Sequence, residues 1–152
     1  KILPIITNPS PILRQKSREI NIKKIDKKIK ELINNMATTL AEIKGAGLAA
    51  PRVGKNIRLI LANKKNGALP MINPLISWAS PEEAPGEEGC FSVLNQNGEI
   101  IFGTVKRFKK IKCEYFTPEG QKKNLMAEGL LARVIQHEID HLDGILFIDK
   151  II

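Results

Sequence analysis

The sequence predicts an α+β fold, and three observations support this. Apolar residues recur at helical spacing from Ile25 to Ile43, and a second helical pattern runs from Gly129 to Leu142. Between them lie short apolar or alternating runs of strand length, separated by turn residues. Helices combined with strands that look antiparallel define the α+β class.

The first helix follows a lead-in of 20 residues that contains Pro4, Pro9 and Pro11 and is expected to be extended or looping. The apolar stripe of the helix consists of Ile25, Ile29, Leu32, Ile33, Met36, Leu40 and Ile43. Asp26 in the first turn suits the positive helix end, and Gly45 ends the helix. We expect this long amphipathic helix to pack on a sheet.

Five strands are predicted, and two of them are joined by a turn at Pro118-Glu119-Gly120. They are expected at Ile57–Leu61, Met71–Trp78, Glu99–Val105, Lys109–Phe116 and Gln121–Ala127. In the fourth strand Ile111, Cys113 and Tyr115 face one side, so Cys113 is expected to be a core residue.

Composition limits the class of protein. The 152 residues suit one domain over 1–152, and 43% apolar with 26% charged residues is ordinary for a globular protein. No uncharged stretch can span a bilayer, and the N-terminus lacks the features of a secretory signal. We therefore expect a location in the cytoplasm, bacterial or phage-encoded, or inside an organelle. Because the chain opens with Lys1, a preceding segment is expected to have been removed or left out.

The net charge of +8 permits attraction to an anionic partner, yet aromatic residues are only 5% and offer no stacking platform for bases. The simpler interpretation is an ordinary basic surface. Neither a membrane nor DNA is expected as a partner.

The closing helix carries an H-E-x-x-H motif at His137, Glu138 and His141. A spacing of four residues places both imidazoles on one helix face, where they can share a metal ion. Glu138 can then take a proton from water at that ion. Two histidines on a helix can also be ordinary core residues.

A catalytic metal normally has three protein donors and an open position. No Glu follows His141, and Phe147 stands where an extended motif would carry a third His. The remaining strong donor is Cys90, which follows a loop rich in Pro and Gly. A Cys/His/His site would suit Fe(II), Zn(II), Ni(II) or Co(II).

These residues resemble the peptide deformylase family, whose three motifs occur here in order. They are the stretches Gly45-Ala46-Gly47-Leu48-Ala49-Ala50-Pro51-Arg52, Glu88-Gly89-Cys90-Phe91-Ser92 and Gln136-His137-Glu138-Ile139-Asp140-His141. The resemblance implies antiparallel β-sheets packed around a central, metal-binding C-terminal helix, with a long N-terminal helix. It also implies removal of the formyl group from the N-terminal formyl-methionine of nascent chains, usually with Fe(II), replaceable by nickel, cobalt or zinc.

Carried over by resemblance, Cys90, His137 and His141 are the metal ligands and Glu138 is the general acid/base. The backbone N–H of Phe91 would bind the oxyanion. Substrate contacts would come from Gly45, Ala46, Gly47, Val134 and Arg107. Weak ribosome contact is a further expectation, through the basic residues Lys106, Arg107, Lys109, Lys110 and Lys112.

One position departs from the family pattern, because Arg52 stands where the first motif normally ends in Gln. Either the guanidinium supplies the oxyanion contact, or it points away and a donor is missing. Three alternatives therefore stay open. They are a weakly active or degenerate deformylase homologue, a small metallopeptidase, and a basic RNA-binding protein with a structural metal site.

Overall fold

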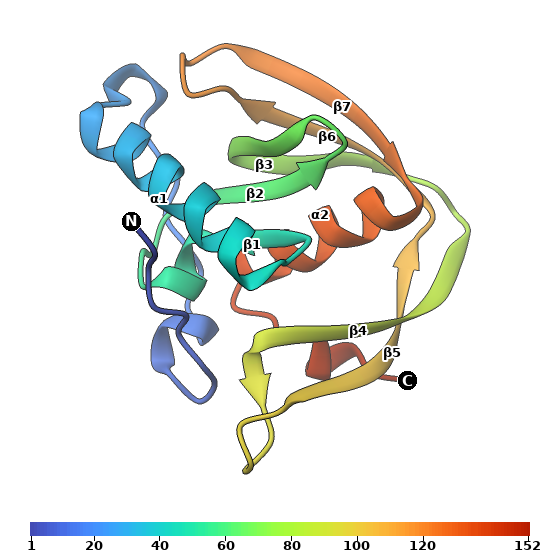
Figure 1. Ribbon diagram of the computed structural model, residues 1–152. Helices are drawn as coiled ribbons and strands as arrows, with labels where there is room; N and C mark the ends of the chain where they lie inside the picture. Colours follow the sequence, from blue (N-terminus) through green and yellow to red (C-terminus); the bar gives the residue numbers. More distant parts are fainter.

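The computed structural model describes residues 1–152 and contains two long helices and two antiparallel sheets (Figure 1). The larger sheet has the strand order β1-β2-β3-β6-β7, and the smaller pairs β4 with β5. The helices are α1 (Lys27–Ile43) and α2 (Gly129–Leu142); the strands are β1 (Gly47–Ala49), β2 (Leu59–Lys64), β3 (Gly67–Ala79), β4 (Glu83–Leu94), β5 (Ile100–Phe108), β6 (Lys110–Phe116) and β7 (Lys122–Glu128). Four short 3₁₀ turns lie at Pro11–Arg14, Ile22–Lys24, Ala50–Val53 and Phe147–Lys150.

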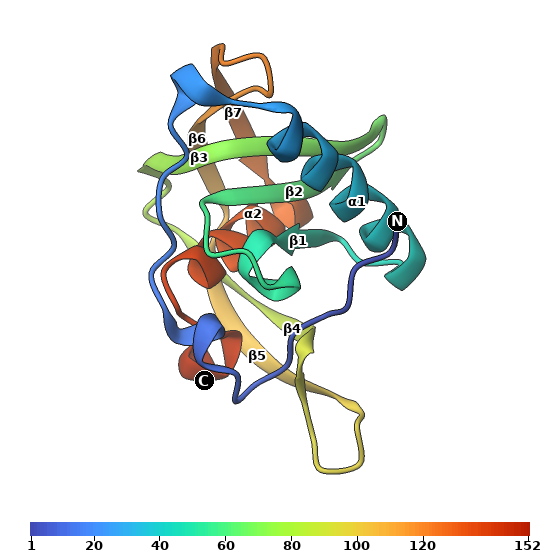
Figure 2. The same cartoon turned by 90° about the vertical axis from the view of Figure 1, so that its left-hand side faces the viewer.

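The two helices cover opposite faces of the larger sheet (Figure 2). Strand β2 shows why, since all its residues from Leu59 to Ala62 are fully buried. Ile60 and Ala62 pack with Ile135 and Ile139 of α2 in one apolar cluster. Leu59 and Leu61 pack with residues of α1 in another. Alternating side chains of one strand thus hold both helices.

Helix α2 lies at the centre of the molecule, with the larger sheet on one side and β4–β5 on the other (Figure 1). A third apolar cluster fills the space beneath β4 and β5 and contains Cys90, Val93, Val105, Leu146 and Phe147. The fold therefore brings the middle of α2 against β4.

Most predicted elements are present with small shifts of their ends. Helix α2 has the expected bounds, and α1 begins at Lys27 because the side chain of Asp26 caps it by accepting a hydrogen bond from the Ile29 N–H. The lead-in is irregular apart from its 3₁₀ turns, as expected.

Two strands were not predicted. The segment before Cys90 was expected to be a loop, yet it forms the 12-residue strand β4, whose Pro85, Gly86 and Gly89 hide the strand pattern. Strand β1 is only three residues long. Both line the candidate site. No helix of the chain is long and apolar enough to cross a membrane.

Candidate metal centre

Three side chains from two distant segments converge at the centre of the molecule. His137 and His141 lie one turn apart on α2, with ring centroids 5.0 Å apart, and both are buried. Cys90 reaches them from β4 at a point where its pairing with β5 is interrupted between Gly89 and Leu94. The Cys90 Sγ lies 3.5 Å from the His141 Nε2.

The donor atoms of these three residues fit one metal ion. One ligand atom from each of Cys90, His137 and His141 lies within 4.8 Å of the other two. Bonds of about 2.3 Å to sulfur and 2.0–2.1 Å to imidazole nitrogen place donors at such separations around a shared ion. A thiolate with two imidazoles also leaves one tetrahedral position open.

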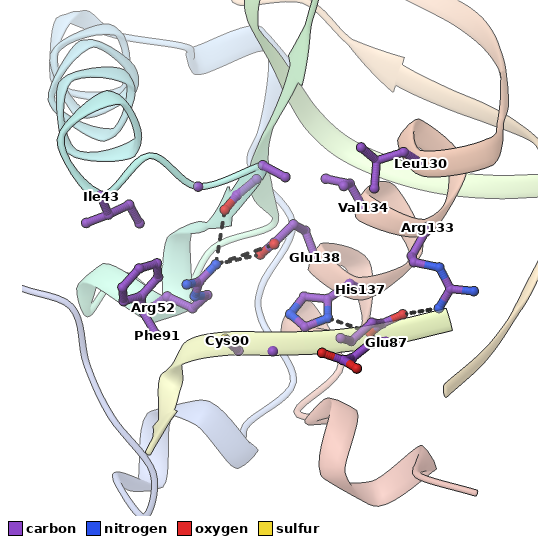
Figure 3. Close-up of a pocket in the computed structure, with 15 residues that line it drawn as sticks. Ile43, Arg52, Glu87, Cys90, Phe91, Leu130, Arg133, Val134, His137 and Glu138 are labelled. Carbon is purple, nitrogen blue, oxygen red and sulfur yellow. Dashed lines mark hydrogen bonds and ion pairs between the residues drawn. The ribbon is translucent and has the colours of Figure 1, made fainter. Parts of the chain in front are cut away.

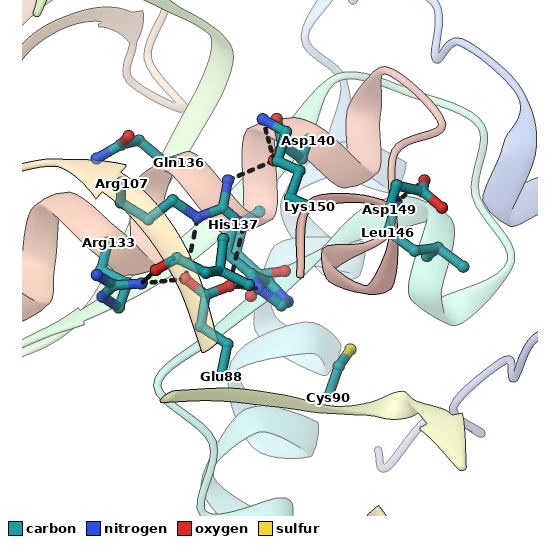
Figure 4. Close-up of polar contacts among 12 residues, drawn as sticks. Glu88, Cys90, Arg107, Arg133, Gln136, His137, Asp140, Leu146, Asp149 and Lys150 are labelled. Carbon is teal, nitrogen blue, oxygen red and sulfur yellow. Dashed lines mark hydrogen bonds and ion pairs between the residues drawn. The ribbon is translucent and has the colours of Figure 1, made fainter. Parts of the chain in front are cut away.

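A buried carboxylate fixes the orientation of His137. Glu88 Oε1 lies 2.9 Å from His137 Nδ1, which leaves the Nε2 atom for the metal. Glu88 also accepts two hydrogen bonds of 2.9 Å from Arg107 and one of 2.6 Å from Arg133 (Figure 4). Burial opposes ionisation of Glu88, but its bonds to His137 and Arg107 prevail and hold the pKa of Glu88 well below its usual value.

The pKa values of the donors follow from the same neighbours. Burial disfavours charge on Cys90, yet the positive charge of Arg52 and the hydrogen bond to His137 lower the pKa of the thiol. Burial likewise opposes protonation of His137, but the bonds to Cys90 and Glu88 raise the pKa of His137 to about 9. Burial, Arg52 and His137 lower the pKa of His141 far below its usual value. The site thus favours the metal-binding forms of Cys90 and His141.

Arg52 points into this site and is 3% exposed. Its Nη1 lies 3.2 and 3.4 Å from the two carboxylate oxygens of Glu138 and donates to the Gly47 carbonyl at 3.1 Å (Figure 3). Its Nε donates to Ser92 Oγ at 3.2 Å, and its Nη2 makes no hydrogen bond within the protein. The expectation that Arg52 turns away is therefore wrong. Burial lowers the pKa of Arg52, but Cys90 and Glu138 more than offset it, so the pKa is raised.

A cavity of about 200 Å³ opens above the donors (Figure 3). Its walls contain Gly45, Ala46, Gly47, Phe91 and Val134 together with Arg52, Cys90, His137 and Glu138. Strand β1 is the edge of the larger sheet, so Gly47 pairs with β2 on one side only. An extended peptide in the cavity can therefore pair with the free edge of this segment.

The placement of Arg107 differs from the expectation. Arg107 is 3% exposed, does not line the cavity, and lies behind Glu88, where it also binds Asp140 (Figure 4). It is also not part of an exposed basic face. Sequence reasoning gave no role to Glu88 or Arg133, although Glu88 lies within the second motif.

A helix-borne H-E-x-x-H motif with a nearby cysteine donor and an open cavity defines the class of metal-dependent hydrolases. Comparison with known proteins gives the family. The sequence model of the polypeptide deformylase family matches residues 2–152. A peptide deformylase of Desulfitobacterium hafniense is 41% identical over 149 residues, which is 98% of this chain and 94% of the relative.

Solved structures agree with this assignment. The crystal structure of peptide deformylase from Thermotoga maritima superposes with a TM-score of 0.92 at 37% identity, covering 100% of this chain and 99% of that one. A class I type b peptide deformylase from Acinetobacter baumannii, bound to Met-Ala-Ser, gives 0.90 at 31% identity, with 99% of each chain covered. The chain belongs to the peptide deformylase family, and it is a metal-dependent hydrolase.

Proposed function

We propose that this enzyme removes the formyl group from the N-terminal formyl-methionine of nascent polypeptides and releases formate. The observation that carries the proposal is the convergence of Cys90, His137, His141 and Glu138 at a cavity beside the free edge of β1. The relative that binds Met-Ala-Ser supports it, because that peptide has the sequence type of a deformylated product.

Cys90, His137 and His141 would hold one divalent ion, with Fe(II) as the physiological metal and Zn(II), Ni(II) or Co(II) as substitutes in preparations. Thiolate and imidazole donors suit all four ions. When bound, such an ion supplies Lewis-acid chemistry, polarising the formyl carbonyl and making water acidic enough to attack at neutral pH.

Glu138 would act as the general acid/base. Its carboxylate lies in the cavity next to the donors, where it can accept a proton from the attacking water and later deliver it to the leaving amine. The ion pair with Arg52 holds this carboxylate in place. The backbone N–H of Phe91 and the free Nη2 of Arg52 are our candidates for donors to the oxyanion.

The peptide backbone would pair with Gly45, Ala46 and Gly47, and Val134 would contact the methionine side chain. A larger residue does not fit at Gly47, because a Cβ there would lie 2.7 Å from Val134 Cγ1 and 2.9 Å from Glu138 Cγ. Arg107 would act as a positioning residue that holds Glu88 against His137.

The substrate also defines the setting. We propose that the enzyme acts where formylated chains are made, in a bacterial cytoplasm or inside an organelle. The exposed residues Lys106, Lys109, Lys110 and Lys112 are the candidates for weak ribosome contact.

The test is formate release from formyl-Met-Ala-Ser by protein loaded with Fe(II) under anaerobic conditions. We expect release by the wild type and a loss of about 10²–10⁴-fold in the Glu138→Gln variant, which keeps the metal ligands. Acetyl-Met-Ala-Ser serves as the control substrate. Hydrolysis of internal peptide bonds without formate release would instead identify a metallopeptidase.

A further inference from the structure

Arg133 closes the cavity at the end opposite Arg52 (Figure 3). It projects from α2 beside Leu130 and Val134, which also line the cavity. Its guanidinium is held by three acceptors. Nη1 donates to Glu88 Oε2 at 2.6 Å and to the Val105 carbonyl at 3.0 Å, and Nη2 donates to the Ala84 carbonyl at 2.7 Å.

The guanidinium also lies directly against the backbone of Gly86. A Cβ built on Gly86 would be 2.7 Å from Arg133 Cζ, 2.8 Å from Nη2 and 2.9 Å from Nε. Only the missing side chain of Gly86 lets Arg133 take this position. Contact with Gly86 on one face and three hydrogen bonds at its edge restrict the guanidinium to one place.

A second cavity of about 480 Å³ lies beyond this guanidinium. It is bordered by Ala84, Pro85, Phe108 and Gly129, and the one residue that lines both cavities is Arg133. The side chain of Arg133 therefore separates the smaller catalytic cavity from a larger space between β4, β5 and the start of α2.

We infer that Arg133, seated on Gly86, is the residue that sets the greatest length of the first side chain this enzyme accepts. This inference rests on the proposed function. With the formyl carbon at the metal donors and the backbone along Gly45–Gly47, the side chain next to the scissile amide enters the end formed by Val134, Leu130 and Arg133. A methionine-length chain fits before the guanidinium, and a longer one collides with it.

The test measures kcat/KM for formyl-X-Ala-Ser peptides in which X is unbranched and either equal to methionine in length or two methylenes longer. In the wild type we expect the longer substrate to be at least about tenfold poorer. In Arg133→Ala the passage to the second cavity opens. The ratio of longer to shorter substrate should then rise by about 15-fold, since each buried methylene contributes about fourfold.

Arg133 also touches Glu88, so a second variant separates a specificity role from a structural one. Arg133→Lys keeps a positive charge beside Glu88 but has a slimmer end, and we expect an intermediate rise in the same ratio. It also decides the question if Arg133→Ala does not fold. A ratio unchanged from wild type, with both substrates slowed equally, would overturn the inference and leave Arg133 as a support for Glu88.

Failure of the proposed function gives a different result. If the wild type releases no formate from any of these peptides, the chemistry is wrong. The length limit is then measured by calorimetric binding of the unformylated X-Ala-Ser peptides. The same rise in relative affinity for the longer peptide in Arg133→Ala would uphold the inference, and equal relative affinities in wild type and variant would refute it.

Discussion

Replacing Arg52 by glutamine tests how the buried ion pair shapes the reaction. The wild-type guanidinium makes four contacts, two with the Glu138 carboxylate and one each with the Gly47 carbonyl and Ser92 Oγ. Glutamine is the residue expected here from the family motif. Its shorter, neutral carboxamide can donate to Glu138 but cannot make all of these contacts.

The structure gives the size of both expected effects. A hydrogen bond to a charged partner contributes about 1.5–3 kcal/mol, and a neutral donor contributes about 1 kcal/mol less. Since Glu138 must accept a proton during the reaction, a weaker partner should lower the barrier by about 1–1.5 kcal/mol, or about tenfold in rate. Losing the contacts with Gly47 and Ser92 as well should reduce the free energy of unfolding by about 2–4 kcal/mol.

The assay is kcat for formate release together with urea unfolding of the same Fe(II)-loaded protein. Arg58→Gln is the matched control, because Arg58 also pairs with a carboxylate, Asp143 at 2.9 Å, but lies outside the cavity. It should lose stability without a gain in rate. An Arg52→Gln variant that is tenfold slower than wild type would refute the reasoning and show that the guanidinium itself is required.

Further changes separate the metal site from its surroundings. Cys90→Ser should abolish stoichiometric metal binding measured by elemental analysis, while Cys113→Ser should keep it, because Cys113 lies in the core away from the donors. Burial raises the pKa of Cys113 to about 11, so iodoacetamide should label the metal-free protein at Cys90 alone; labelling of both thiols would contradict this. Glu88→Gln should lower the free energy of unfolding by about 3–5 kcal/mol, since buried cations lose their partner, whereas exposed Glu87→Gln should change it by about 0.5 kcal/mol or less. Gly47→Ala should reduce kcat/KM by about 10²-fold with the metal retained, because the added methyl group would displace Glu138; an unchanged value would show that the segment can shift.

Periodicity predicted the helices well because each has one apolar face with a clear partner. Helix α2 and the interior position of Cys113 follow from local pattern alone. Strand β4 does not, because Pro85, Gly86 and Gly89 weaken the local signal and its partner β5 is fixed by long-range pairing. The three residues of β1 are too few to show any period.

At the site, residue types predicted which atoms can share a metal, and the structure places those of Cys90, His137 and His141 together. The direction of Arg52 and the partners of Arg107 were beyond reach, because they depend on carboxylates supplied by other elements. The role of Gly86 is a similar case. Its need for a missing side chain exists only because Arg133, far along the chain, packs against it.

X-ray absorption at the metal edge of zinc-loaded protein probes the ligand set directly. We predict a first shell with one sulfur at about 2.3 Å and two imidazole nitrogens at about 2.0–2.1 Å, completed by a light atom from solvent. The sulfur should disappear in Cys90→Ser and remain in Cys113→Ser. A first shell without sulfur in the wild type, or one with four protein ligands and no solvent position, would contradict the account.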